Sequence, residues 1–275
     1  MTRRPESTTA GKVWLVGAGP GDAGLLTLKG LRALEAADVI VADRLGARAV
    51  LDGLAADDVT LRAEVVDVGK LPGHHAVPQD AINALLVQLA HDGKTVVRLK
   101  GGDPYVFGRG GEELHACQEA GVAVEVVPGI TSAISVPAIA GIPLTHRGVA
   151  TAFTVATAHD QIASLSGGRD HTVVLLMGIA TLANSAIILA RGERGADCPV
   201  AVVEDGFGPR QRVTVGTLST IAHQAAARGI RSPAVVVVGD VVRLSPYAPA
   251  ELATLELTHY DPLAVPGASR KAPTQ

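Results

Sequence analysis

Residues 100–113 read KGGDPYVFGRGGEE and contain five glycines within eleven residues, 101–111. The short, apolar and β-branched segment 95–99 before them predicts a strand, and residues 113–120 after them predict a helix. A glycine-rich turn at the carboxyl end of a strand is where open α/β sheets bind ligands, because glycine lets the backbone approach a ligand closely. Asp103 adds a carboxylate among bare amides, which favours a neutral or cationic hydroxylated molecule over a pyrophosphate. The alternative, a connection without a ligand, is disfavoured because ordering five glycines costs conformational entropy.

Strand and helix patterns alternate on both sides of this loop. We predict a mostly parallel N-terminal sheet, because strand-like segments at 13–16, 39–42, 64–68 and 124–127 alternate with helical segments at 25–36, 46–54 and 80–91. Later strand-like segments follow one another at hairpin-like spacing, which predicts a mixed C-terminal sheet; they are 150–156, 171–177, 200–203, 211–215 and 233–238. The sequence therefore predicts an α/β protein with two α/β domains, at 12–130 and 131–245. Residues 1–11 and most of 246–275 are predicted to be disordered tails.

The bulk composition restricts the class of protein. Of the 275 residues, 47% are hydrophobic and 19% are charged, which indicates a globular chain. No apolar run reaches the ~18 residues of a membrane span, and no apolar core follows Met1–Pro5, so we expect neither a membrane span nor a signal peptide. A net charge of −3 disfavours nucleic acid and anionic membranes as partners. Cys117 and Cys198 lack metal-ligand spacing and fit a reducing cytosol.

Residues 17–22, GAGPGD, come close to a dinucleotide-binding turn without matching it. The dinucleotide fingerprint requires glycine where Asp22 stands, and an aspartate at a helix entrance repels a pyrophosphate. Pro20 also interrupts the turn. These two departures disfavour an NAD-dependent oxidoreductase.

Polar side chains follow two more of the predicted strands. Asp43 follows 39–42, and it is equally consistent with a ligand contact or with a cap on the helix at 46–54. Lys70 follows 64–68 and is either an exposed lysine or part of an anion site. His74 and His75 are adjacent, so their side chains are expected to point apart, which disfavours a metal pair.

The loop at 100–113 resembles the signature of the uroporphyrinogen-III C-methyltransferases, which belong to the tetrapyrrole methylase family and use S-adenosylmethionine (SAM). The resemblance covers roughly residues 12–244 and recurs in several rare motifs in the same order. Those motifs are VGAGPGD (16–22), DRL (43–45), VGK (68–70), PGITSA (128–133), GIPLTHR (141–147) and LMG (176–178).

The resemblance implies both a fold and a reaction. In the fold, the active-site cleft lies between the two domains. The reaction is C-methylation of uroporphyrinogen III at C-2 and C-7, which gives precorrin-2, via precorrin-1, and S-adenosylhomocysteine (SAH). It feeds cobalamin synthesis, sirohaem synthesis or both. The resemblance also implies a cytoplasmic homodimer that needs no metal, and no nucleic-acid or membrane partner is expected.

The resemblance also assigns site residues. The family carries a carboxylate at the position of Asp43 as proton acceptor, and we expect Lys70 to complete the catalytic pair as proton donor or as the charge that keeps Asp43 ionised. Cofactor-binding positions for SAM are Pro20, Gly101, Gly102, Asp103, Val106, Thr131, Ser132, Met177 and Gly206. Substrate-binding positions, suited to the eight carboxylates of the substrate, are Arg44, Arg109, His146 and Arg147. Arg98 and Lys100 stand at a strand end and are taken as structural.

Five positions depart from the family pattern. They are Ala42, Gly46, Ala47, Leu71 and Phe207, where the family usually has Tyr, Val, Ser, Arg and Thr. The departures bear on local packing, substrate contacts and the adenine pocket. Two alternative functions are a methyltransferase for a later precorrin or cobalt-precorrin intermediate and a non-catalytic SAM-binding protein.

Overall fold

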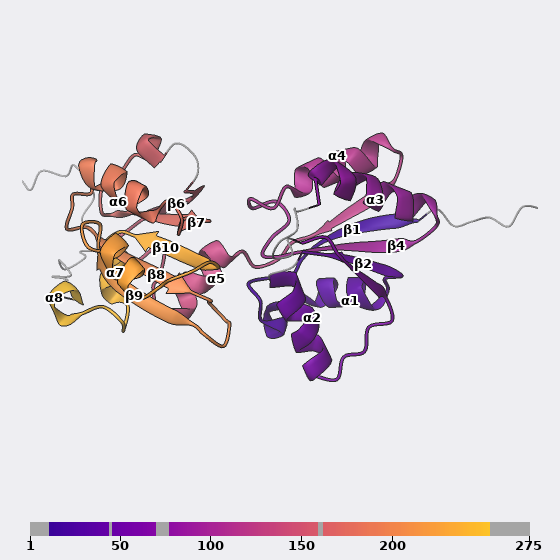
Figure 1. Cartoon of the computed structure of the whole chain (residues 1–275), viewed down its shortest axis with the longest axis horizontal. Coiled ribbons are helices and arrows are strands. Elements are labelled where there is room, and N and C mark those ends of the chain that lie inside the picture. Colours follow the sequence, from indigo (N-terminus) through magenta and orange to yellow (C-terminus); the bar gives the residue numbers. More distant parts are fainter. Residues whose placement is uncertain (1–10, 44–45, 70–76, 159–161, 254–275) are drawn as a thin grey trace, which may run out of the picture.

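The computed structural model describes residues 11–43, 46–69, 77–158 and 162–253. The chain forms two α/β units joined by residues 128–131 (Figure 1). The first unit is a five-stranded sheet in the order β3-β2-β4-β1-β5, and all of its pairings are parallel. Its strands are β1 (Lys12–Gly17), β2 (Val39–Ala42), β3 (Glu64–Asp67), β4 (Thr95–Lys100) and β5 (Ala123–Val127).

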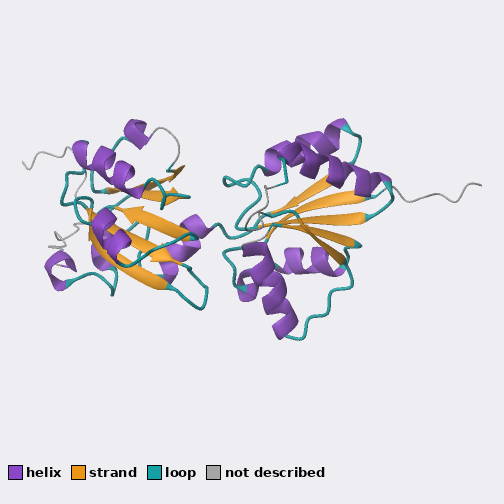
Figure 2. Ribbon diagram, viewed as in Figure 1, coloured by secondary structure: helices purple, strands orange, loops and turns teal. Residues whose placement is uncertain are grey.

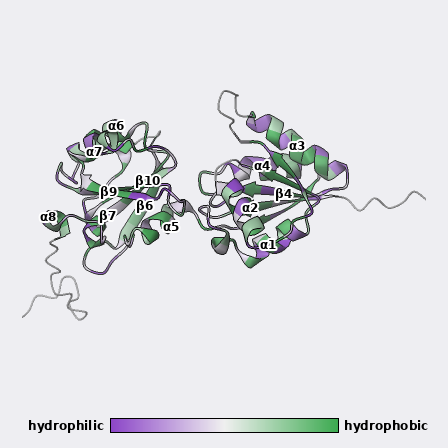
Figure 3. Ribbon diagram, turned by 60° about the horizontal axis from the view of Figure 1, so that its bottom comes forward, coloured by the Kyte–Doolittle hydropathy of each residue, from purple (hydrophilic) through white to green (hydrophobic). Residues whose placement is uncertain are grey.

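Helices cover both faces of this sheet (Figure 2). They are α1 (Leu28–Glu35) and α2 (Gly46–Ala56) on one face, and α3 (Gln79–His91) and α4 (Gly110–Glu119) on the other. Alternate residues of β1 serve the two cores: Val13 and Leu15 pack with α3 and α4, whereas Val16 packs with α1 and α2. Figure 3 shows α3 with alternating hydrophobic and hydrophilic turns, as expected for a helix that buries Ile82 and Leu86.

The second unit is a mixed sheet in the order β6-β7-β10-β8-β9, which confirms the predicted fold class. Within the described part of this second sheet, β6 and β7 pair in parallel and the other pairings are antiparallel. The strands are β6 (Ala152–Thr157), β7 (His171–Leu176), β8 (Pro199–Glu204), β9 (Arg212–Thr217) and β10 (Ala234–Val238). The helix α5 (Ser132–Ile139) packs on one face, and α6 (Leu182–Arg191) and α7 (Ile221–Ala227) pack on the other.

Several predicted helix limits are wrong. The helix predicted at 25–36 is observed as α1 from Leu28, because the hydroxyl of Thr27 accepts a bond from Gly30 N and caps the helix there. The separate 3-10 helix η1 (Ala23–Leu25) ends at the first residue of the predicted range. The helix α7 was not predicted at all. Part of the predicted tail is also ordered, since α8 (Ala250–Ala253) follows η3 (Asp240–Leu244), and Arg243 Nη1 donates to Leu252 O at 2.8 Å. Within the described residues, every helix is too short or too polar to cross a bilayer.

Three glycine backbones cross at the carboxyl edge of the first sheet. A Cβ on Gly129 would lie 2.3 Å from the carbonyl oxygen of Gly102 and 2.6 Å from the Cα of Gly17. Gly19 and Gly102 also exchange backbone hydrogen bonds at 3.1 and 2.7 Å. The turns after β1, β4 and β5 are therefore packed backbone against backbone.

We expect Gly129→Ala to destabilise the fold, because the added methyl meets backbone atoms that cannot move aside independently. The expected loss is about 1–3 kcal/mol, the usual cost of overpacking. Gly111→Ala is the matched control, since no described heavy atom lies within 4 Å of its Cβ position and alanine favours the helix α4. Urea denaturation of both variants tests this, and equal midpoints would contradict it.

Candidate functional site

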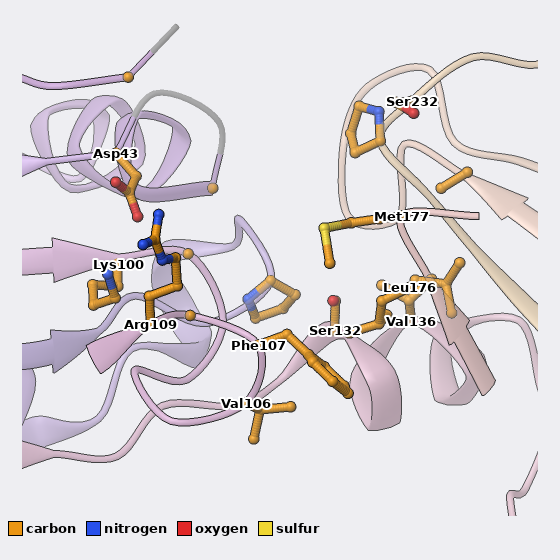
Figure 4. A pocket seen from close by; sticks show the side chains of 18 of the residues that line it. Asp43, Lys100, Val106, Phe107, Arg109, Ser132, Val136, Leu176, Met177 and Ser232 are labelled. Carbon is orange, nitrogen blue, oxygen red and sulfur yellow. The ribbon is translucent and has the colours of Figure 1, made fainter. Parts of the chain in front are cut away.

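A cavity of about 620 Å³ lies between the two units, at the carboxyl edge of the first sheet. Its size is within the range of small-molecule sites. Figure 4 shows Asp43, Lys100 and Arg109 on one side and Leu176 and Met177 on the other. The cavity thus joins a charged wall from the first unit to a largely apolar wall from the second.

The charged wall is built by two neighbouring strands. Asp43 follows β2, and its backbone N–H donates to Leu99 O of β4 at 3.1 Å. Arg98 and Lys100 lie two residues apart on β4, so they share one face of the strand. The sheet order therefore places one carboxylate and two cations at one edge.

A buried ion cluster lies behind this wall, formed by Arg98, Lys100 and Glu113. Their exposed fractions are 2%, 2% and 0%. Glu113 Oε1 accepts a bond from Arg98 Nε and another from Lys100 Nζ, both at 2.9 Å. Gln79 Nε2 donates to the same oxygen at 3.2 Å, and Oε2 has no partner among the described residues. Arg98 and Lys100, taken as structural strand-end residues from the sequence, line the cavity as well.

The cluster shifts the pKa of Lys100. Burial lowers the pKa of the Lys100 ammonium, and the Arg98 charge lowers it further, while Glu113 and Asp43 raise it. Two charged residues, Arg98 and Lys100, at the end of the buried strand β4 were the only sequence signal for this cluster, because a buried strand is normally apolar on both faces.

Asp43 is the cavity-facing end of this ion network. Its Oδ1 accepts a bond from Arg98 Nη2 at 2.5 Å, and its side chain is 38% exposed. Lys70, the predicted partner of Asp43, and Arg44 lie outside the described residues. Among the described residues, the cation that contacts Asp43 is thus Arg98, which the sequence did not suggest.

The loop after β4 is held by Asp103. Its Oδ1 accepts the N–H of Tyr105 at 2.8 Å, and its Oδ2 accepts the N–H of Gly129 at 3.0 Å. Asp103 thus fastens the turn after β4 to the turn after β5. It does not appear among the described residues that line the cavity.

Strained backbone surrounds the cavity. Phe107, Arg109 and Met177 line it and have φ values of 54°, 59° and 55°. Non-glycine residues seldom adopt this region, and such conformations concentrate at functional sites. Met177 is 51% exposed and presents its thioether to the cavity (Figure 4).

Arg109 carries the exposed cation of the charged wall. Its guanidinium donates to both oxygens of Glu112, at 2.8 and 2.7 Å. The hydrogen bond to Glu112 raises the pKa of Arg109, and the same bond lowers the pKa of Glu112. Both side chains are more than half exposed, so solvent screens the pair and it contributes little to stability.

The structure brings most of the predicted site residues together. Those that line the cavity are Pro20, Asp43, Gly101, Val106, Arg109, Ser132, Met177 and Gly206. Gly102 lies in the glycine crossing, and Thr131 caps α5 by accepting the N–H of Ala133 at 3.3 Å. His146 and Arg147 are exposed and are not among the described lining residues.

The lining residues fit SAM as a ligand. Gly101 leaves backbone bare at the strand end, Ser132 offers a hydroxyl, and Met177 offers a soft thioether surface for an adenine or a sulfonium. Gly206 packs closely against Val136, another lining residue, since a Cβ at position 206 would lie 2.8 Å from the methyl groups of Val136. Among the described residues, no group of three or more His, Cys, Asp or Glu side chains is placed to hold a metal.

The sequence of the chain matches a known protein family. The Tetrapyrrole (Corrin/Porphyrin) Methylases match residues 12–222. The chain belongs to this family. That membership confirms the resemblance found in the sequence motifs.

Two curated relatives are similar in sequence to this chain over most of its length. An S-adenosyl-L-methionine-dependent uroporphyrinogen III methyltransferase of Methanosarcina barkeri is 50% identical over 242 residues, which cover 85% of this chain and 93% of the relative. A siroheme synthase of Gluconobacter oxydans is 52% identical over 241 residues, covering 85% of this chain and 50% of the relative. The chain thus spans nearly all of the first relative and about half of the second.

Solved structures of the family share the fold. A uroporphyrin-III-C-methyltransferase from Thermus thermophilus has a TM-score of 0.70 at 44% identity, covering 86% of this chain and 95% of that one. A Thermus thermophilus enzyme complexed with SAH has a TM-score of 0.70 at 39% identity, covering 85% and 100%. The family thus includes a member whose structure holds the demethylated product of SAM.

Proposed function

We propose that this protein transfers methyl groups from SAM to C-2 and C-7 of uroporphyrinogen III, and so makes precorrin-2 and SAH. The observation that carries the proposal is the cavity, which joins a wall of buried cations and Asp43 to the thioether of Met177. The 50% identity to a uroporphyrinogen III methyltransferase over 93% of its length supports the same substrate. Precorrin-2 would feed cobalamin or sirohaem synthesis.

The glycine-lined part of the cavity would hold SAM, with Pro20, Gly101, Val106, Ser132, Met177 and Gly206 as its contacts. SAM supplies an electrophilic methyl group on its sulfonium. The residues that surround it have mainly a positioning role, because a porphyrinogen carbon is already nucleophilic and needs orientation and exclusion of water. The largely apolar wall of the second unit favours the exclusion of water around the bound molecules.

The charged wall would receive the acidic tetrapyrrole. Arg109 can exchange Glu112 for a substrate carboxylate with little loss, because the exposed pair is weak. Asp43, which lines the cavity, would accept the proton that leaves the substrate after methylation. Substrate contacts by Arg44, His146 and Arg147, and proton donation by Lys70, remain predictions.

The test is an anaerobic assay with SAM and uroporphyrinogen III, followed by oxidation and mass spectrometry. We expect tetrapyrrole products that carry first one and then two added methyl groups. No transfer to uroporphyrinogen III, with transfer to a later corrin precursor in a parallel assay, would favour the first alternative. Tight SAM binding without transfer to any tetrapyrrole would favour a binding protein.

We expect Asp103→Ala to weaken SAM binding, because it frees the N–H groups of Tyr105 and Gly129 and loosens the turn that carries Gly101. The expected loss is about 1.5–3 kcal/mol of binding free energy, the scale of a hydrogen bond to a charged group. Isothermal titration calorimetry with SAH measures it, and Asp103→Asn, which keeps one acceptor oxygen, is expected to lose less. An unchanged affinity for Asp103→Ala would exclude the role.

We also propose a cytoplasmic homodimer. Apolar side chains exposed on the second unit support an interface, among them Ile134, Ile139 and Phe153, which are 45%, 39% and 42% exposed. Light scattering at micromolar concentration is expected to give twice the chain mass. The two unpaired cysteines, Cys117 and Cys198, are consistent with a reducing compartment.

A further inference from the structure

Glu113 is completely buried, yet it lies one layer behind the cavity and not in its wall. Glu113 belongs to the first turn of α4. One of its carboxylate oxygens accepts three hydrogen bonds, two from β4 and one from α3. Those donors are Arg98 Nε, Lys100 Nζ and Gln79 Nε2. Each of the three donor residues lines the cavity.

Glu113 is the charged partner that, together with two backbone carbonyls, holds the orientation of Arg98 toward Asp43. A guanidinium is planar and rigid, so fixing its Nε fixes the directions of both terminal nitrogens. Nη1 donates to Val41 O and Leu99 O at 3.3 Å each, which leaves Nη2 to reach Asp43 Oδ1 at 2.5 Å. The Asp43 carboxylate is thus oriented through Arg98 by a residue that it does not touch.

Without the Glu113 charge the wall would hold two buried cations side by side. The Glu113 carboxylate raises the pKa of Lys100, in opposition to burial and to Arg98. Removing that carboxylate would drive Lys100 to lose its proton or turn away, and it would release Arg98 from its plane. Such a buried cluster is not an efficient source of stability, because desolvation offsets the attraction between the charges.

We propose that Glu113 is a positioning residue for methyl transfer: it holds Arg98 and Lys100 at the cavity wall and, through Arg98, aims the Asp43 carboxylate. This inference rests on the proposed function. Glu113 would act through Arg98 and Lys100, without contacting SAM or uroporphyrinogen III itself.

A double-mutant cycle between Glu113→Gln and Asp43→Asn tests the inference. In the wild-type background we expect Glu113→Gln to slow single-turnover methyl transfer about 10- to 100-fold, the scale of coupling within one network. In the Asp43→Asn background the same change is expected to slow transfer less than about threefold, because Asp43 no longer needs aiming. SAH affinity is expected to stay within about threefold, since Glu113 does not line the cavity.

Glu119→Gln is the matched control, because Glu119 is on the same helix, is 68% exposed and pairs only with exposed His115 among the described contacts. It is expected to leave turnover unchanged. An equal slowing by Glu113→Gln in both backgrounds would make Glu113 merely structural, and turnover within about twofold of wild type would also overturn the inference. If Glu113→Gln does not fold, Glu113→Asp takes its place in the cycle, with the same two expected outcomes.

A readout independent of turnover separates this inference from the proposed function. We expect the Arg98 Nε–H to give a slowly exchanging side-chain NMR signal in the full chain, and to exchange at least about tenfold faster in Glu113→Gln but not in Glu119→Gln. Unchanged exchange in Glu113→Gln would overturn the inference even if the wild type methylates uroporphyrinogen III. A wild type that transfers no methyl group, but shows the expected exchange, would overturn the proposed function alone.

Discussion

Asp43→Asn is expected to slow turnover about 10²- to 10⁴-fold, the usual contribution of a general base. The amide keeps the shape of the carboxylate but cannot take the proton that leaves the substrate. Calorimetry is expected to find SAM binding nearly intact, because Asp43 stands on the charged wall opposite Met177.

Two outcomes would contradict this role for Asp43. Turnover within a few-fold of wild type would reduce Asp43 to a structural partner of Arg98. Loss of SAM binding together with turnover would mean that the substitution disrupts the wall as a whole. Asp52→Asn is a suitable control, because Asp52 makes only an exposed contact with Arg48 among the described ion pairs.

Arg98→Met is expected to destabilise the first unit by about 3–5 kcal/mol, because it leaves the buried Glu113 carboxylate without one of its two cationic partners. Arg48→Met removes an arginine of the same size from an exposed i,i+4 pair and is expected to cost no more than about 0.5 kcal/mol. Urea denaturation followed by fluorescence resolves the difference. Trp14, the single tryptophan, lies in β1 and reports on the unit that contains Arg98. Equal midpoints for the two variants would show that the buried Glu113 carboxylate does not need the Arg98 charge for stability.

The sequence predicted most of the sheet because buried strands carry their signal locally. The short apolar runs predicted as strands at 39–42 and 200–203 lie in β2 and β8, which are buried along their whole length. The helix α7 has a mostly small-residue sequence, IAHQAAA, with no strong hydrophobic period, which explains why it was missed. The helix α8 was missed because its order depends on a contact with Arg243, which no local pattern shows.

The candidate site was predictable where turns follow strands, and not where side chains meet across elements. Gly101, Ser132 and Met177 were assigned from motif positions, and the cavity brings them together. The cluster around Glu113 could not be derived in that way, because it depends on how α4 is set against β4. A charged residue at the start of a helix is usually solvent-exposed, and only the packed structure shows Glu113 to be buried.

The crossing of Gly17, Gly102 and Gly129 has a consequence for protein engineering. Each of the three turns occupies space that a side chain on another would need, so none can be redesigned alone. Transplanting only the 100–113 loop from a relative with different cofactor or substrate preference would therefore disturb the turns at 17–22 and 128–131. A chimera is expected to fold well only when all three segments come from the same parent.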